Sequence, residues 1–258
     1  MIFSSAELLS QLATLMWPLI RISALVVAIP VFGSRLLPIR LKVVLVLALT
    51  IAIAPHIPPV GAVEIFSING GIVAMQQVLI GLAMGFALQL VFQVFVLGGQ
   101  VIALTMGLGF ASLNDPSSGV VVPTVSQFYT IFITLLFLAM NGHLVMIEVL
   151  AQSFIDLPIS QTGLGSDGIW KLLSWASYVF SGAVLMALPA LASLLIVNLG
   201  FGVMTRAAPQ LNIFAIGFPV IMTIGFVIMM VSLPSALPLF ESLLDSVYQL
   251  MYFMIGAR

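Results

Sequence analysis

The sequence predicts an all-α membrane protein of about six long helices that pack as hairpins. Of its 258 residues, 62% are hydrophobic and only 6% are charged, and the mean hydropathy is +1.29. A soluble domain carries about 25% charged residues, so this chain cannot cover a water-facing surface. Its apolar residues form long charge-free runs, whereas the strands of a membrane barrel alternate over about 10 residues. Helical spans are therefore expected.

The first elements follow from the spacing of charges and prolines. A helix needs roughly 20 mostly apolar residues to cross a membrane, because each residue adds about 1.5 Å. Residues 8–33 are apolar apart from Arg21, and a shorter run at 43–54 ends at Pro55. These runs predict helices over 6–32 and 39–54.

The later elements come from four further charge-free runs. They lie between Glu64 and Asp115, Asp115 and Glu148, Lys171 and Arg206, and Arg206 and Glu241. The helices predicted from them cover 71–97, 123–150, 171–204 and 213–232, and an amphipathic segment follows at 239–255. Loops are expected near 33–38, 55–70, 112–122, 151–169 and 205–212, where Pro and Gly mark most of the breaks. Residues 1–258 form one membrane domain in this interpretation.

The 50-residue run between Glu64 and Asp115 does not fit a simple helix count. Gly98 and Gly99 are expected to break it, which leaves 100–113, a segment too short to cross. The following residues are apolar yet rich in helix breakers. Irregular backbone at membrane depth occurs where it is buried in protein or lines a water-filled cavity. A re-entrant or pore-lining loop is one interpretation, and a long helix that ends in a surface turn at 114–116 is the other.

Polar side chains inside the spans predict protein contacts. Arg21 is either a buried charge with a partner or, the interpretation favoured here, part of a helix that is not fully in lipid. Gly81-x-x-x-Gly85 places two glycines on one helix face and allows close helix packing. The same segment carries five glutamines, which need hydrogen-bond partners away from water: Gln76, Gln77, Gln89, Gln93 and Gln100. They indicate a larger membrane assembly or, alternatively, the core of an intramolecular bundle.

Residue types needed for most chemistry are missing from the sequence. There is no cysteine, and the two histidines, His56 and His143, form no H-E-x-x-H pair. A G-x-S-x-G nucleophile motif and a P-loop are also missing. Seven basic residues against eight acidic ones provide no basic surface for nucleic acid. We expect no enzyme, no cofactor, no metal and no nucleic-acid partner.

Two blocks of the sequence are specific enough to indicate a family. One is the glycine-rich run from Met106 to Pro116, and the other runs from Arg206 to Pro219 and has the pattern R-x-A-P-Q-x-N-x-F-x-x-G-F-P. The second block resembles a motif of the FliR family of type III export-gate proteins, and the first is similar to the central loop of that family. Shorter matches extend the resemblance over the whole chain: Met75-Gln76-Gln77 through Gly81-x-x-x-Gly85-Phe86, and Phe137 through Asn141-Gly142-His143. One departure is Gln100, where many members of the family carry Glu.

The resemblance implies a non-enzymatic subunit of the flagellar export gate. In that family one copy assembles with five FliP and four FliQ subunits, and FlhB associates with the complex. The channel passes unfolded flagellar proteins through the bacterial inner membrane at the flagellar basal body. The resemblance also implies that much of the complex is raised toward the periplasm, so that membrane lipid covers only part of it. The related injectisome gate subunit shares these motifs, and a stand-alone secondary transporter is the remaining alternative.

The resemblance and the residue chemistry together assign three groups of site residues. The pore-sealing loop, in which apolar side chains dewet a constriction and glycines ease its movement, comprises Met106, Gly107, Leu108, Gly109, Phe110, Leu113, Asn114, Asp115 and Pro116. The assembly motif comprises Arg206, Pro209, Gln210, Asn212, Phe214, Gly217, Phe218 and Pro219. The helix-packing residues are Gln76, Gln77, Gly81, Gly85, Asn141, Gly142 and His143. No catalytic or metal-binding residue is assigned.

Overall fold

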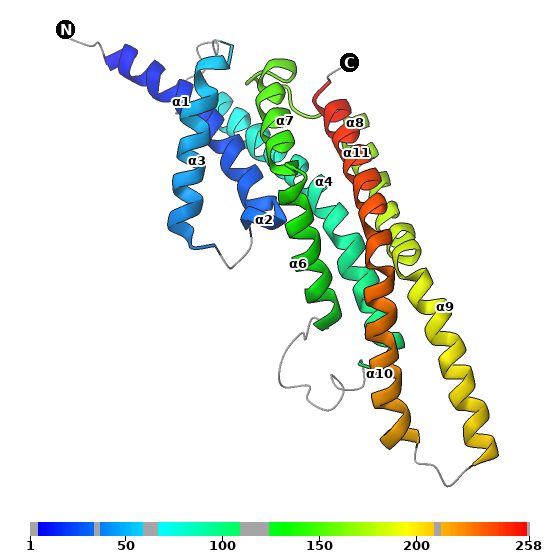
Figure 1. Ribbon diagram of the computed structural model, residues 1–258. Helices are drawn as coiled ribbons and strands as arrows, with labels where there is room; N and C mark the ends of the chain where they lie inside the picture. The colour runs from blue at the N-terminus through cyan, green and yellow to red at the C-terminus, as the bar shows by residue number, and fades with distance from the viewer. Residues whose placement is uncertain (1–4, 34–36, 59–66, 109–123, 209–212, 257–258) are drawn as a thin grey trace. The chain divides into compact units, whose positions relative to one another are not determined.

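The computed structural model describes residues 5–33, 37–58, 67–108, 124–208 and 213–256, without the side chains of 5–14 and 213–216. All regular structure in these ranges is helical (Figure 1). The helices are α1 (Ser5–Ala28), α2 (Pro30–Gly33), α3 (Ile39–Ile53), α4 (Ile68–Thr105), α6 (Thr124–Ala139), α7 (Gly142–Asp156), α8 (Ser166–Trp175), α9 (Ser177–Ala207), α10 (Ile213–Ser232) and α11 (Ala236–Ile255), with short 3₁₀ turns at Ala54–His56 and Leu233–Ser235. The predicted all-α class is confirmed.

The chain forms two compact units, and segments distant in sequence contribute to each. Unit 1 contains residues 1–90, 137–175 and 244–258, and unit 2 contains residues 91–136 and 176–243. The single membrane domain predicted over 1–258 stays a prediction. Four described helical stretches are long and apolar enough to cross a membrane, or five if α6 and α7 form one broken span. The four stretches are Ile39–His56, Ile68–Thr105, Ser166–Ala207 and Gly217–Ile255.

The predicted break at Gly98 and Gly99 is wrong, because α4 continues without interruption to Thr105. Both glycines lie at close helix contacts inside unit 2. A Cβ on Gly98 would collide with the Met186 side chain, and a Cβ on Gly99 would lie 2.8 Å from Ser126 Cα. These glycines therefore permit packing rather than end the helix.

Gly107 caps the C-terminal end of helix α4, two residues after Thr105. This residue has φ +82°, a left-handed conformation that glycine adopts without a steric penalty. The Gly107 N–H donates to Leu104 O, and the Leu108 N–H donates to Ala103 O, both at 3.0 Å. This pair of bonds is the Schellman motif that satisfies the last carbonyls of a helix. The re-entrant loop and the surface turn considered above both fall mainly within 109–123, outside the described residues.

The single helix predicted over 123–150 is also wrong, since two helices, α6 and α7, occupy this region. Asn141 separates them with φ 57°, a backbone conformation that Asn tolerates better than most residues. A Cβ on Gly142 would lie 2.5 Å from the Phe137 ring, so only glycine fits this turn. The Asn-Gly dipeptide is a turn signal that the charge-gap reading overlooked.

The predicted loop over 151–169 contains regular structure at both ends. Helix α7 continues to Asp156, and the separate helix α8 begins at Ser166. The helix predicted over 171–204 therefore corresponds to the end of α8 and to α9. Helix α10 matches the predicted 213–232, and α11 confirms the amphipathic segment predicted at 239–255.

Close backbone approach holds unit 1 together. A Cβ on Gly81 would collide with Arg21 O, and one on Gly85 would collide with the Ala28 side chain. The contact of Gly85 with Ala28 lies further toward the C-terminus of both helices than the contact of Gly81 with Arg21. Helices α1 and α4 therefore run parallel at this contact. Helix α3 also packs on α1. The Tyr248 hydroxyl of α11 donates to Gly142 O at 2.9 Å, which ties α11 to the start of α7.

Unit 2 is built around the second half of α4. Val94 fills the space above Gly182 of α9, with its Cγ1 3.0 Å from the Cβ that Gly182 lacks. The Phe240 ring meets the rings of Phe92 and Phe95 edge to face, at centroid distances of 6.2 and 5.7 Å. Such aromatic pairs are worth about 0.5–1.5 kcal/mol beyond their area of burial.

Candidate functional site

The first described residues of the predicted pore-sealing loop are packed on helix α10. Met106 is 0% exposed. Its Cγ lies 2.7 Å from the position of a Cβ on Gly225, so the methionine occupies a notch that this glycine leaves open. The ring of Phe218 lies 3.4 Å from the position of a Cβ on Gly107. The structure thus joins two predicted groups, because Met106 and Gly107 contact the helix that carries the end of the assembly motif.

Gly225 is a contact residue that the sequence analysis missed. Glycine within an apolar helix was the only available signal, and the sequence contains many such positions. The burial of Met106 makes it a packing residue at the base of the loop. Leu108 is half-buried, and the rest of the predicted loop lies outside the described residues. Its sealing role stays a prediction.

We expect substitutions at Met106 and Gly225 to have non-additive effects on stability, because the two residues share one space. Gly225→Ala places a methyl group where the Met106 side chain lies, and overpacking of this kind costs about 1–3 kcal/mol. Shortening the opposing side chain in Met106→Ala/Gly225→Ala should restore part of that loss. The measurement is the thermal midpoint of the purified protein in a double-mutant cycle. Additive effects of the two substitutions would contradict the contact.

The assembly motif spans the end of α9 and the start of α10. Arg206 is exposed in the last turn of α9, where its charge complements the negative end of the helix dipole. Gly217 is buried, and Pro219 lies within α10, where its carbonyl accepts a 2.8 Å hydrogen bond from Thr223. Pro209, Gln210 and Asn212 lie outside the described residues, as does the side chain of Phe214.

Arg21 and Gln77 are hydrogen-bonded to each other inside unit 1. The sequence analysis treated the first as an unusual charge and the second as a helix-packing residue, without connecting them. Arg21 Nε donates to Gln77 Oε1 at 2.8 Å, and both residues are 0% exposed. Arg21 Nη1 donates to Ser153 O at 2.7 Å and to Ser153 Oγ at 3.0 Å. Arg21 Nη2 donates to Leu157 O at 3.0 Å. Four neutral acceptors therefore hold this cation, in a cluster that we call the Arg21 cluster.

The C-terminus of α7 stabilises the buried charge in place of a carboxylate. Ser153 lies in the last turn of α7 and Leu157 is its C-cap, so both carbonyls belong to the negative end of the helix dipole. The Phe154 ring adds a cation–π contact, with its centroid 4.3 Å from Arg21 Cζ. The interpretation of Arg21 as a buried charge with partners is confirmed, although the favoured interpretation was a helix only partly in lipid.

The remaining packing residues also fall in unit 1. Gly81 and Gly85 form the contact between α1 and α4, and Asn141 and Gly142 form the turn before α7. His143 is half-buried, and its Nδ1 has no hydrogen-bond partner among the described residues. Within the described ranges, no group of three or more His, Asp or Glu side chains could hold a metal ion.

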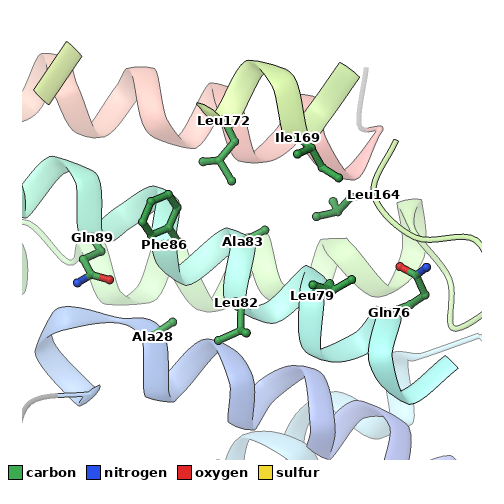
Figure 2. Close-up of a pocket in the computed structure, with 10 residues that line it drawn as sticks. All are labelled: Ala28, Gln76, Leu79, Leu82, Ala83, Phe86, Gln89, Leu164, Ile169 and Leu172. Atoms are coloured by element: carbon green, nitrogen blue, oxygen red, sulfur yellow. The ribbon is translucent and has the colours of Figure 1, made fainter. Parts of the chain in front are cut away.

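An apolar groove of about 650 Å³ lies along α4 in unit 1 (Figure 2). We call it the α4 groove, and its lining residues are Ala28, Gln76, Leu79, Leu82, Ala83, Phe86, Gln89, Leu164, Ile169 and Leu172. Gln76 and Gln89 lie at its two ends in Figure 2. Leu79, Leu82 and Phe86 between them are 46%, 40% and 40% exposed. The two amides could thus hydrogen-bond an apolar occupant that carries polar groups at both ends.

Comparison with known proteins identifies the family of the chain. The family described as "Bacterial export proteins, family 1" matches residues 12–247. The chain belongs to this family. Among curated members of the export family, the flagellar biosynthetic protein FliR of Escherichia coli K12 is 38% identical over 248 residues, which cover 96% of this chain and 95% of the relative. FliR of Pectobacterium carotovorum is 37% identical over 249 residues, with the same coverage of both chains.

More distant members of the export family align over most of the chain as well. FliR of Bacillus subtilis is 28% identical over 215 residues, which cover 82% of this chain and 83% of the relative. The resemblance to the FliR family is therefore confirmed. The matched residues 12–247 include both the Arg21 cluster and the contact between Met106 and Gly225.

Proposed function

We propose that this chain is a non-enzymatic subunit of the flagellar type III protein-export gate. The observation that carries the proposal is its similarity, over nearly the full length, to relatives named flagellar biosynthetic protein FliR. With FliP and FliQ it forms the inner-membrane channel for unfolded flagellar proteins. The relatives' names favour the flagellar system over the injectisome.

The surface of unit 1 supports a role within an assembly. The α4 groove exposes apolar side chains between two glutamines. Acyl chains offer no acceptor or donor to an amide, and an amide left unpaired in hydrocarbon costs several kcal/mol. A helix of a neighbouring subunit provides both apolar contact and polar partners. The α4 groove therefore fits a partner helix better than it fits lipid.

Partner stoichiometry tests the proposal directly. We expect one copy of this chain with five FliP and four FliQ subunits, with FlhB associated, at the flagellar basal body and partly raised toward the periplasm. Native mass spectrometry of the detergent-extracted complex measures these copy numbers. A monomer or a symmetric homo-oligomer of this chain would instead support a stand-alone transporter.

Deleting residues 107–113 is expected to raise ion leakage through the assembled complex. The deletion removes Leu108, Phe110 and Leu113, the side chains proposed to keep a closed constriction dry. Conductance of the reconstituted complex is the measurement, with native mass spectrometry as the control for assembly. Unchanged conductance in an intact complex would remove the sealing role from this loop.

Replacing Arg206 with Ala is expected to reduce recovery of the complex and to leave the leak unchanged. The exposed arginine lies at the C-terminal end of α9, where its loss removes about 0.3–1 kcal/mol of dipole stabilisation. Its contacts to partner subunits would be lost as well. Recovery equal to that of the unmodified protein would show that Arg206 has no part in assembly.

A further inference from the structure

Helix α8 presents three distinct sides around its axis. Successive residues are about 100° apart on a helix, so residues three or four apart share a side. Gly168, Leu172 and Trp175 form the buried side. This side packs on α11: a Cβ on Gly168 would lie 3.5 Å from Met254 Cα, and Trp175 Nε1 donates to Ser246 Oγ at 2.9 Å. Both contacts lie within unit 1.

The other two sides of α8 are exposed and differ in chemistry. Ile169, Trp170 and Leu173 are 45%, 72% and 57% exposed, and they form one contiguous apolar side. Asp167, Lys171 and Ser174 are also exposed and form the polar side. A short helix with one exposed apolar side and one polar side suits the boundary between acyl chains and water.

The position of α8 in the chain indicates the same boundary. Only Ala176 separates α8 from α9, and the helical stretch Ser166–Ala207 has 42 residues and contains an 18-residue window with a mean hydropathy of 2.2. At about 1.5 Å per residue, this stretch is roughly twice as long as an approximately 30 Å hydrocarbon core. Some of its residues must lie beyond that core. The segment 157–165 before α8 carries three consecutive polar residues, Ser160, Gln161 and Thr162, ahead of this apolar stretch.

We propose that α8 is a membrane-interface helix whose apolar side, anchored by Trp170, inserts into the lipid bilayer at headgroup depth. Tryptophan is enriched at this depth because its ring is apolar and its N–H is polar. Lys171 adds charge complementarity to lipid phosphate groups. The Lys171 Nζ lies 3.7 Å from the ring centroid of Phe253. This cation–π contact holds the ammonium group close to α8, on its polar side. This surface is distinct from the α4 groove, although Ile169 borders both.

Tryptophan fluorescence in bilayers tests the proposal, because the chain has only three tryptophans. The full complex is reconstituted in nanodiscs of phosphatidylcholine brominated either near the headgroup or near the acyl-chain end. The fluorescence of Trp170 is obtained by subtracting the emission of the Trp170→Phe complex from that of the unmodified complex. We expect headgroup-proximal bromine to remove about half of this signal or more, and acrylamide to quench it weakly. Trp175→Phe is the matched control: the Trp175 indole is 6% exposed, so its signal should respond to neither quencher.

Two outcomes would overturn the proposal. Strong quenching by acrylamide alone would place Trp170 in water, and quenching by neither reagent would mean that another subunit covers it. A second measurement covers the case in which Trp170→Phe fails to assemble. Because the chain has no cysteine, Leu173→Cys and Ser174→Cys each create a unique site in it for a nitroxide label. The label at 173 should be more accessible to oxygen than to a nickel chelate, and the label at 174 should show the reverse. Equal accessibilities at the two sites would reject a lipid-facing side.

Discussion

Replacing Arg21 with Met is expected to abolish recovery of folded protein from the membrane. The substitution removes the donor shared by Gln77, Ser153 and Leu157, of which Gln77 and Ser153 are buried in unit 1 and Leu157 is half-buried. A buried acceptor left without a donor costs about 1–3 kcal/mol, and four acceptors lose theirs here, which is a large share of a domain stability of about 5–15 kcal/mol. The yield of monodisperse protein after extraction and its thermal midpoint are the measurements.

Two further variants separate charge from geometry at Arg21. Arg21→Lys keeps the charge, but a single ammonium group cannot reproduce the planar fork that reaches both α4 and the end of α7. We expect it to recover only a small part of the lost stability. Arg40→Met removes the same charge from an exposed position and should change the midpoint little. If Arg21→Met and Arg40→Met behaved alike, the Arg21 cluster would have no structural importance.

The Arg21 cluster shows what residue patterns contain and what they omit. The sequence identifies Arg21 as an unusual charge and Gln77 as an amide in need of a partner. The sequence does not connect these two residues with Ser153 and Leu157, which lie 132 and 136 positions after Arg21. Two of the four acceptors are backbone carbonyls, which every residue has. Only the three-dimensional packing of α7 against α1 selects these two.

The errors at glycine positions have a similar origin. A Gly-Gly pair weakens an isolated helix, and the predicted break after residue 97 relied on that local property. In the structure, Met186 and Ser126 press against Gly98 and Gly99, so tertiary packing outweighs helix propensity. At Asn141 and Gly142 the local signal was correct, but an apolar composition on both sides concealed it. A prediction based on segments without charged residues finds apolar runs but does not detect a turn within such a run.

The start of helix α8, and its separation from α9, were missed for the opposite reason. Asp167 and Lys171 interrupt the apolar runs, so that a search for charge-free segments assigns much of this region to a loop. The helix is defined instead by its amphipathic spacing, with Gly168, Leu172 and Trp175 on one buried side. A periodicity search would have found it. Interface helices are therefore the elements that a hydropathy map of a membrane protein omits most readily.

Gly81→Ala is expected to destabilise the protein although alanine is the better helix former. The added Cβ would collide with Arg21 O and lie 2.8 Å from the Ala24 side chain, so α1 and α4 must separate. Backbone oxygen cannot move aside as a flexible side chain can, and overpacking of this type costs about 1–3 kcal/mol. The separation also moves Arg21 relative to Gln77, which adds to the cost because the two residues are hydrogen-bonded.

Gly71→Ala is the matched control for this prediction. It makes the same chemical change in the same helix, but no atom lies within 4 Å of the added Cβ. Helix propensity alone then acts, and the expected result is no loss or a gain of up to about 1 kcal/mol. Thermal midpoints of both variants, measured in the same detergent, give the comparison. Opposite signs would assign the loss to the contact between α1 and α4, whereas equal shifts would show that this contact is not tight enough to require glycine.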